Sequence, residues 1–203
     1  MMKKRNPVPA AERKAMIVQT VIRLAAERNP EEITTAAMAE AMGLTQGALF
    51  RHFPTKEAIR EEVMGWTAEH LLAAVRTATE GVTHPLLALE AAFHAHLTFT
   101  FEYPGVPRIL FSELQKQERT PVKLAARNLM KQYSGMICDW IAEGKATGQI
   151  GAQLDERVTA MAMIGLIQGL MMQSLLSGKP ERTRKQADAT FAIFRRGIEG
   201  DRT

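Results

Sequence analysis

The sequence predicts an all-α fold, on two observations. Apolar residues recur at the three- and four-residue spacing of a helix along nearly the whole chain, as they do from Ile17 to Ala25. No stretch alternates polar and apolar residues over the length of a strand, and runs of β-branched residues are absent. Caps and breakers between the periodic segments indicate about nine helices.

The expected helices are bounded by capping residues, glycines and prolines. They cover about residues 10–28, 36–42, 45–53, 55–79, 84–102, 108–117, 121–145, 156–177 and 181–198, with Thr34 or Thr35 as the N-cap of the second. Asn29 is expected to adopt a left-handed cap after the first helix, before Pro30 stops it. Residues 103–107, which contain two prolines, are expected to form a turn, and Asp155 is expected near the cap of the eighth helix.

The composition is that of an ordinary globular protein of 203 residues, which is long enough to bury a core. A single cysteine, Cys138, cannot form an internal disulfide. The N-terminal residues are basic but are not followed by the apolar run of a secretory signal. Residues 161–176, the longest apolar stretch, contain three polar residues and are expected to be too short to span a bilayer. A cytoplasmic protein is therefore expected.

Basic residues are concentrated at the N-terminus. Residues 1–60 contain ten Lys and Arg and six Asp and Glu, whereas the remaining chain contains sixteen of each kind. This asymmetry indicates a polyanionic partner for the N-terminal part alone. A solvated basic face without such a partner is the alternative.

Residues 35–53 have the pattern of a helix-turn-helix. Two short helices meet at Gly43 and Leu44, while Leu49 and Phe53 are spaced to pack inward. The second helix is left with an outer edge that suits the major groove of DNA, because amide and guanidinium groups read bases and hydroxyl and ammonium groups bind phosphates. The candidate DNA-binding residues are Thr35, Thr45, Gln46, Gly47, Phe50, Arg51, His52 and Lys56. Many short helix pairs joined by a glycine turn do not bind DNA, and this alternative remains.

Residues 17–59 resemble the DNA-binding domain of the TetR (tetracycline repressor) family of bacterial transcriptional regulators. The motif residues that carry the resemblance are Ala39, Gly43, Leu44, Gly47, Leu49, Phe50, His52, Phe53, Lys56 and Ile59. The resemblance implies a homodimer, with a DNA-binding domain over residues 1–55 and a ligand-binding and dimerisation domain over residues 56–203. It also implies a repressor that leaves a palindromic operator when a small apolar or aromatic effector binds.

Three positions depart from the family pattern. Phe50 stands where a tyrosine usually donates a hydrogen bond to phosphate, Ala36 stands where some members place a base-reading arginine, and Asn29-Pro30 replaces a glycine-aromatic corner. These departures concern the sequence of the operator. Lys3, Lys4 and Arg5 could follow a minor groove as an arm, or could be a solubilising tail.

The ligand-binding region is expected among the apolar residues of the later helices. The candidates are Phe93, His96, Leu97, Phe101, Met130, Tyr133, Met136, Ile137 and Met163. For each residue taken singly, an ordinary core position is the stronger alternative. His94 and His96 point in different directions on a helix, so they are not expected to hold one metal ion.

The last two expected helices are the candidates for dimerisation. Residues 160–178 are apolar on nearly every face, and Gly165 and Gly169 would allow another helix to approach closely. Motifs for catalysis, cofactors or metals are absent from the sequence, so an enzyme is not expected. Two functions remain: an effector-responsive repressor, and a DNA-bound architectural or activating protein without an effector.

Overall fold

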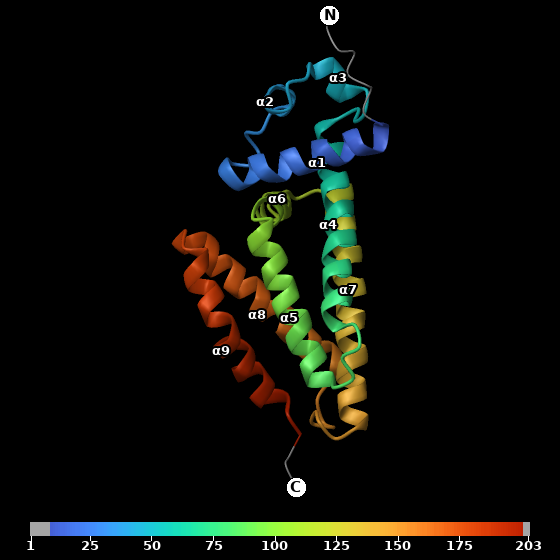
Figure 1. Cartoon of the computed structure of the whole chain (residues 1–203), viewed down its shortest axis with the longest axis vertical. Helices are drawn as coiled ribbons and strands as arrows, with labels where there is room; N and C mark the ends of the chain where they lie inside the picture. The colour runs from blue at the N-terminus through green and yellow to red at the C-terminus, as the bar shows by residue number, and fades with distance from the viewer. Residues whose placement is uncertain (1–8, 201–203) are drawn as a thin grey trace, which may run out of the picture. The chain divides into compact units, whose positions relative to one another are not determined.

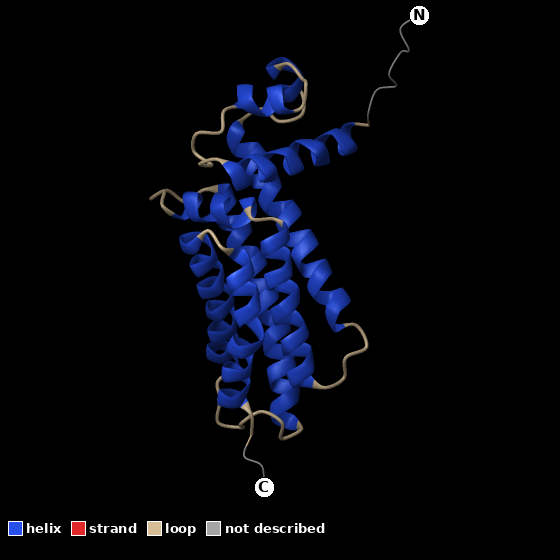
Figure 2. Ribbon diagram, turned by 60° about the vertical axis from the view of Figure 1, so that its left-hand side comes forward, coloured by secondary structure: helices blue, strands red, loops and turns tan. Residues whose placement is uncertain are grey.

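The computed structural model describes residues 9–200, and these residues form nine α-helices. The helices are α1 (Ala10–Glu27), α2 (Thr35–Ala41), α3 (Gln46–Phe50), α4 (Lys56–Thr79), α5 (Pro85–Glu102), α6 (Gly105–Leu114), α7 (Pro121–Ala146), α8 (Glu156–Ser177) and α9 (Pro180–Ile198) (Figure 1). Within the described range, the only β-type pairing is an isolated bridge between Ile150 and Glu199, and loops join the helices elsewhere (Figure 2). The predicted all-α fold is confirmed. The basic residues Lys3, Lys4 and Arg5 lie outside the described range.

The chain folds into two compact units that are not consecutive in sequence. The first, here called the N-terminal unit, consists of residues up to Thr67 together with Tyr103–Ala126, and therefore contains α1–α3, the start of α4, α6 and the start of α7. The second, here called the C-terminal unit, consists of Ala68–Glu102 and Arg127–Thr203. The domain boundary expected at residue 55 stays a prediction.

Most helix ends follow the local sequence signals. Thr34, Thr45 and Asp155 are N-caps whose side chains accept hydrogen bonds from backbone N–H groups. Gly43 has φ +63°, a left-handed conformation that glycine adopts without steric penalty, and this ends α2 as expected. The left-handed cap expected at Asn29 was wrong, because no described non-glycine residue has positive φ. The Asn29 side chain instead accepts a hydrogen bond from Glu31 N at 3.1 Å.

The beginning of α6 differs from the prediction. The helix begins at Gly105, within the expected turn, and ends at Leu114 rather than near Gln117. Pro107 lies in the first turn of α6, where a missing N–H removes no intrahelical hydrogen bond. Prolines at 104 and 107 therefore mark the entrance of this helix and do not separate a turn from it.

A close contact with α1 explains why residue 105 is a glycine. A Cβ atom at Gly105 would overlap the carbonyl oxygen of Ile22 and would lie 2.8 Å from its carbonyl carbon. The glycine thus allows the backbone of α6 to meet the backbone of α1. Just before α6 in sequence, the ring of Tyr103 packs edge to face against Trp66 of α4, with ring centroids 4.9 Å apart. These contacts hold α6 within the N-terminal unit, although α6 is far from α1 in sequence.

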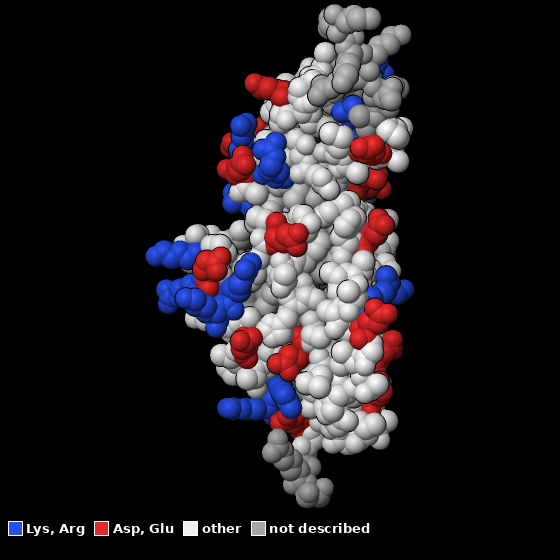
Figure 3. All heavy atoms as spheres, in the orientation of Figure 1, with Lys and Arg blue, Asp and Glu red and all other residues white. Residues whose placement is uncertain are grey.

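The C-terminal unit has a core of helices α5, α7, α8 and α9. Its most deeply buried side chains include Phe93, Tyr133, Ile137, Met163 and Phe191. Phe93 packs against Phe191, with ring centroids 5.2 Å apart. On the face shown in Figure 3, Lys and Arg side chains gather over the first turns of α9, where the sequence places Arg182, Arg184 and Lys185.

Helix α8 extends beyond the apolar stretch of residues 161–176 at both ends. It has 22 residues with a mean hydropathy of 1.5 in its most apolar window, so its length and composition would suit a membrane span. Length and composition alone do not distinguish a membrane span from an apolar helix packed in a globular protein. A third of that window is buried inside the protein, and the buried residues include Ala160, Met163, Ile164 and Ile167.

Replacing Gly105 with alanine is expected to destabilise the protein. The added methyl group meets backbone atoms of α1 that cannot rotate away, and overpacking of this kind costs about 1–3 kcal/mol. Denaturant unfolding measures the change. Gly65→Ala is the control, because Gly65 lies in α4 of the same unit with nothing within 4 Å of its Cβ position. The control should be neutral or stabilising by up to about 1 kcal/mol. Equal stability of the two variants would show that the α1–α6 contact is looser than described.

Candidate functional site

The turn between α2 and α3 is fixed by backbone and capping hydrogen bonds. Leu44 N donates to Ala39 O at 2.8 Å across the turn at Gly43. Thr34 Oγ1 accepts from Ala37 N at 3.1 Å, and Thr45 Oγ1 accepts from Ala48 N at 3.2 Å. Each short helix therefore has its own cap, and the geometry is that of a helix-turn-helix.

Helix α3 has a buried side and an exposed side. Leu49 and, just beyond the helix, Phe53 are almost fully buried, which holds α3 against the rest of the N-terminal unit. Gln46, Gly47 and Arg51 are exposed, and Phe50 is 44% exposed although it is aromatic. A Cβ atom at Gly47 would meet only Thr45 Oγ1, at 4.0 Å, so packing inside the protein does not require this glycine.

Thr35 and Gln46 meet where the two helices begin. Gln46 Nε2 donates to Thr35 Oγ1 at 3.3 Å, which joins the first turn of α2 to the first turn of α3. The oxygen of the Gln46 amide and the second amide hydrogen are left for other partners, and these two groups are the ones that pair with adenine. Two of the candidate residues are therefore adjacent in space.

The first turn of α4 supplies a further cation. Thr55 caps the helix, since its Oγ1 accepts from Ala58 N at 3.0 Å. Lys56 Nζ donates to the backbone oxygen of Glu31 at 2.9 Å, which leaves two of the three ammonium hydrogens for other acceptors. Partial burial and the charge of Arg60 lower the pKa of Lys56, while the Glu31 and Glu57 carboxylates act in the opposite direction.

His52 lies in a different setting from the other candidates. It is half-buried and lines a groove of about 440 Å³ together with Phe53, Glu61 and Glu62. The ammonium of Lys14, on the same groove, lies 5.4 Å from the centre of the Phe53 ring. The groove thus contains the Lys14 ammonium as well as the carboxylates of Glu61 and Glu62.

Sequence reasoning missed a buried ionic cluster beside these residues. Arg60 is only 4% exposed, and its guanidinium donates to Glu31 Oε1 at 3.0 Å, to Glu113 Oε2 at 3.5 Å and to Pro30 O at 2.8 Å. Glu113 also pairs with Lys116 Nζ at 2.8 Å. A local sequence pattern does not predict contacts between residues this far apart. The one sequence signal was an arginine directly after Ile59, on a helix face expected to be buried.

Both carboxylates of this cluster remain charged. Burial acts to raise the pKa of Glu113, but hydrogen bonds from Lys116 and Thr120 and the charges of Lys116 and Arg60 lower it overall. Burial likewise opposes the shift at Glu31, where hydrogen bonds from Ser112 and Arg60 and the nearby cations lower the pKa. The cluster is therefore a set of charged partners rather than neutral acids.

The candidate ligand-binding residues belong to the C-terminal unit, mostly in its core. Phe93, Leu97, Tyr133, Ile137 and Met163 are buried, with at most 3% exposure. Phe101, Met130 and Met136 are half-buried. The Phe101 ring lies beneath the guanidinium of Arg184 on α9, 5.1 Å from ring centre to Cζ. The structure thus brings most of these residues into one packed core.

His96 is the polar member of this core. It is 6% exposed, its ring centre lies 5.1 Å from that of Tyr133, and its Nδ1 has no hydrogen-bond partner. Burial lowers the pKa of His96 to about 4, and burial raises the pKa of Tyr133, whose hydroxyl donates to Ala92 O at 3.4 Å. His94 instead pairs with Asp188 on α9 at 3.4 Å.

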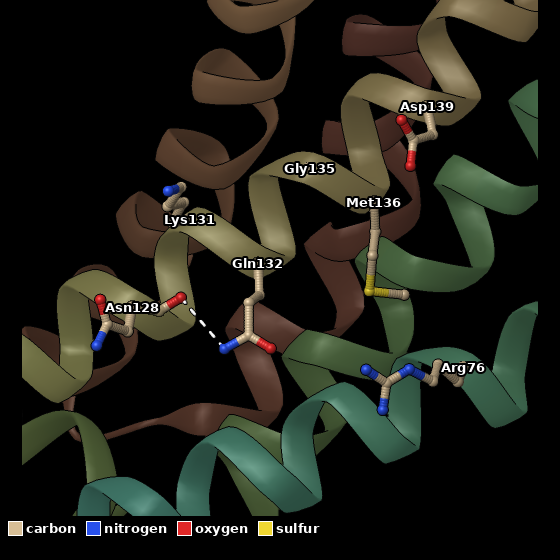
Figure 4. A pocket seen from close by; sticks show the side chains of 7 residues that line it. All are labelled: Arg76, Asn128, Lys131, Gln132, Gly135, Met136 and Asp139. Atoms are coloured by element: carbon tan, nitrogen blue, oxygen red, sulfur yellow. Dashed lines mark hydrogen bonds between the residues drawn. The ribbon is translucent and has the colours of Figure 1, made fainter.

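A groove of about 540 Å³ lies on the C-terminal unit between the later part of α4 and α7. Figure 4 shows its lining residues: Arg76, Asn128, Lys131, Gln132, Gly135, Met136 and Asp139. Met136 is the one sequence-predicted ligand residue among them. Five of the seven lining residues carry polar or charged side chains, although apolar atoms provide most of the exposed lining surface.

Two family models match the chain. Residues 17–63 match "Bacterial regulatory proteins, tetR family", and residues 112–190 match "Tetracyclin repressor-like, C-terminal domain". The chain belongs to the TetR family. The first match contains the helix-turn-helix and the Arg60 side of the ionic cluster, and the second contains Glu113 and α7–α8.

Curated relatives and solved structures agree with this assignment. The chain is 24% identical to the nucleoid occlusion factor SlmA of Alteromonas mediterranea over 93% of this chain and 96% of that protein. It shares the fold of FadR from Bacillus halodurans, described as a fatty acid degradation regulator, with a TM-score of 0.82, 15% identity, and coverage of 97% and 100% of the two chains. FadR of Bacillus subtilis, solved with stearoyl-CoA, gives a TM-score of 0.80 at 14% identity over 91% and 99%.

The function follows at the level of the family. This protein is a TetR-family transcriptional regulator with a helix-turn-helix DNA-binding region. The predicted family, the fold class and the DNA-binding regulator class are confirmed. The roles of individual residues in DNA and ligand binding stay predictions.

The burial of His96 predicts a pH-dependent loss of stability. Its folded pKa of about 4 is below the ordinary 6.5, so the unfolded chain binds a proton first as the pH falls. The stability that neutral His96 provides is complete above pH 6.5 and is lost towards pH 4, by about 1.4 kcal/mol per pH unit. Denaturant unfolding between pH 6.5 and about pH 5 should show this slope.

One variant isolates the contribution of this histidine. His96→Phe should reduce the slope, because phenylalanine does not titrate. Identical slopes for the wild type and His96→Phe would contradict a buried neutral imidazole.

Proposed function

We propose that this protein is a homodimeric repressor that binds a palindromic operator through the exposed edge of α3 and dissociates when an effector binds. The observation that carries the proposal is the division of α3 into a buried side, held by Leu49, and an exposed side that packing leaves unused. Such a helix enters the major groove with its N-terminal residues at the base edges. In this reading residues 1–55 form the DNA-binding domain and residues 56–203 the effector and dimer domain, in the cytoplasm and without a cofactor.

Each candidate residue has a role that its chemistry allows. Gln46 pairs with adenine, and Arg51 reaches a guanine or a phosphate. Thr35, Thr45, His52 and Lys56 bind phosphate oxygens, with help from the N-terminal ends of the helices. Gly47 allows the backbone to approach DNA, and Phe50 packs against a sugar or a thymine methyl group because it has no hydroxyl.

Two substitutions should separate base reading from phosphate binding. Gln46→Ala is expected to relax preference at one base pair by about 1–3 kcal/mol. Lys56→Ala is expected to weaken binding to all sequences and to lower the salt dependence by about one unit of slope. Fluorescence anisotropy with DNA fragments flanking the gene, at several salt concentrations, measures both effects. The operator proposal fails if no fragment binds the wild type more tightly than bulk DNA does.

An exposed apolar stripe supports dimerisation through α8 and α9. Val158, Met161 and Leu176 on α8 are 58%, 67% and 73% exposed, and Ile193 on α9 is 71% exposed. Gly165 and Gly169 lie between the α8 residues, with nothing within 4 Å of their Cβ positions. A second copy could therefore approach closely along α8, and a two-fold dimer matches a palindromic operator.

Met161→Glu is expected to disrupt the dimer. The substitution places an unpaired carboxylate from each subunit in the apolar interface, which should raise the dissociation constant by at least about 100-fold. Sedimentation velocity distinguishes monomer from dimer. Leu124→Glu is the matched control, because Leu124 on α7 is 58% exposed but lies outside the stripe. A dimer that is equally stable in both variants would place the interface elsewhere.

The effector is proposed to bind in the C-terminal unit, at the core that contains His96. The unpartnered Nδ1 of this buried histidine supports the proposal, because a buried polar atom without a partner is unusual and a bound molecule could satisfy it. An effector that stabilises a conformer with differently spaced recognition helices would lower operator affinity, since half-sites lie about 34 Å apart. The stearoyl-CoA in Bacillus subtilis FadR supports an apolar effector class.

The alternative is a DNA-bound architectural or activating protein without an effector. The relatives named nucleoid occlusion factors support it, because that name does not refer to a small molecule. Thermal-shift screening with acyl, aromatic and cationic compounds discriminates the two functions. Stabilisation coupled to release of DNA favours the effector-responsive repressor, and its absence across acyl, aromatic and cationic compounds favours the alternative.

A further inference from the structure

The carboxylate of Glu113 lies at the centre of contacts within the N-terminal unit. The side chain is 1% exposed, and it comes from α6, which is distant in sequence from the helix-turn-helix. Its Oε2 atom pairs with Arg60 at 3.5 Å and with Lys116 at 2.8 Å. A carboxylate this deeply buried persists in charged form only with such partners.

Arg60 extends this contact to one further segment of the unit. Its guanidinium reaches Pro30 O at 2.8 Å and Glu31 Oε1 at 3.0 Å, and both acceptors belong to the loop between α1 and α2. The guanidinium is planar and its donors point in fixed directions, so three acceptors on two segments, the loop and α6, restrict one another's positions. Arg60 therefore ties α6 and α4 to the loop that precedes α2.

The same loop holds the ammonium of Lys56. Glu31 accepts hydrogen bonds at its side chain and at its backbone. Its carboxylate accepts from Arg60 and from the Ser112 hydroxyl, and its backbone oxygen accepts from Lys56 Nζ at 2.9 Å. The position of Lys56 Nζ is thus set by a loop whose own position depends on α6. A chain of contacts runs from Glu113 through Arg60 and Glu31 to Lys56.

We propose that Glu113 is a positioning residue for DNA binding, which acts through Arg60 and Glu31 to place the Lys56 ammonium for contact with a phosphate. The inference rests on the proposed operator binding. An apolar residue at position 113 could fill the same space without desolvating a charge, so stability alone does not explain an ionic cluster here. The ionic cluster instead fixes the orientation of its side chains, because hydrogen bonds restrict the geometry of the groups that they join.

Glu113→Gln tests this role, with Glu118→Gln as the matched control. Glu118 is an exposed residue of the same unit that follows α6 in sequence. Both substitutions remove one negative charge, a change that should slightly strengthen binding to DNA if only net charge matters. Glu113→Gln should instead weaken operator binding on the order of tenfold and lower the slope of affinity against salt by about one, as Lys56→Ala does.

The Lys56→Ala background separates positioning from general destabilisation. If Glu113 acts through Lys56, adding Glu113→Gln to Lys56→Ala should weaken binding by less than about twofold, because the contact is already lost. Additive effects, or an unchanged salt slope in Glu113→Gln measured well below its melting temperature, would overturn the inference. Circular dichroism confirms that each variant is folded.

A milder variant covers the case in which Glu113→Gln does not fold. Ser112→Ala removes only the hydroxyl contact with Glu31, and it should produce a smaller loss of affinity together with a reduced salt slope. Unchanged affinity and slope in this variant would overturn the inference. If the wild type itself binds no operator, both the proposed function and this inference fail. If the wild type binds and Glu113→Gln binds equally well, the inference alone fails.

Discussion

The buried guanidinium of Arg60 is the constraint on which the N-terminal unit depends. At 4% exposure this charge is tolerated only because Glu31, Glu113 and a backbone oxygen surround it. Those acceptors come from the loop before α2 and from α6, so the helix-turn-helix and α6 must adopt one arrangement together. The backbone contact at Gly105 also fixes α6 against α1, but it does so by steric fit rather than by charge.

The exposed side of α3, which is proposed to contact bases, depends on this arrangement although it is not part of the ionic cluster. Leu49 joins α3 to the buried interior, and the hydrogen bond between Gln46 and Thr35 joins its first turn to α2. The loop that precedes α2 is itself held by Arg60. The polar residues proposed to face DNA thus lie on elements whose positions are set by buried contacts. Such fixed positions favour a preorganised DNA-binding surface.

Much of this fold could be predicted from sequence because its helix ends are local signals. Thr34, Thr45 and Asp155 cap helices by bonding to nearby backbone, and Gly43 provides the left-handed turn, so a few consecutive residues contain the information. The start of α6 and the cluster around Glu113 could not be predicted in this way. Both depend on pairs far apart in the chain, such as Gly105 with Ile22, and periodicity within one helix does not identify its distant partner.

Amide hydrogen exchange with and without operator DNA tests most directly whether α6 forms part of the DNA-binding unit. The amides of α6 should exchange with the same free energy of opening as those of α1, because one cooperative unit opens as a whole. On addition of operator, α6 should gain protection together with the loop before α2, although the proposed DNA contacts lie elsewhere. Faster exchange of α6 than of α1, with no change on DNA binding, would contradict the account.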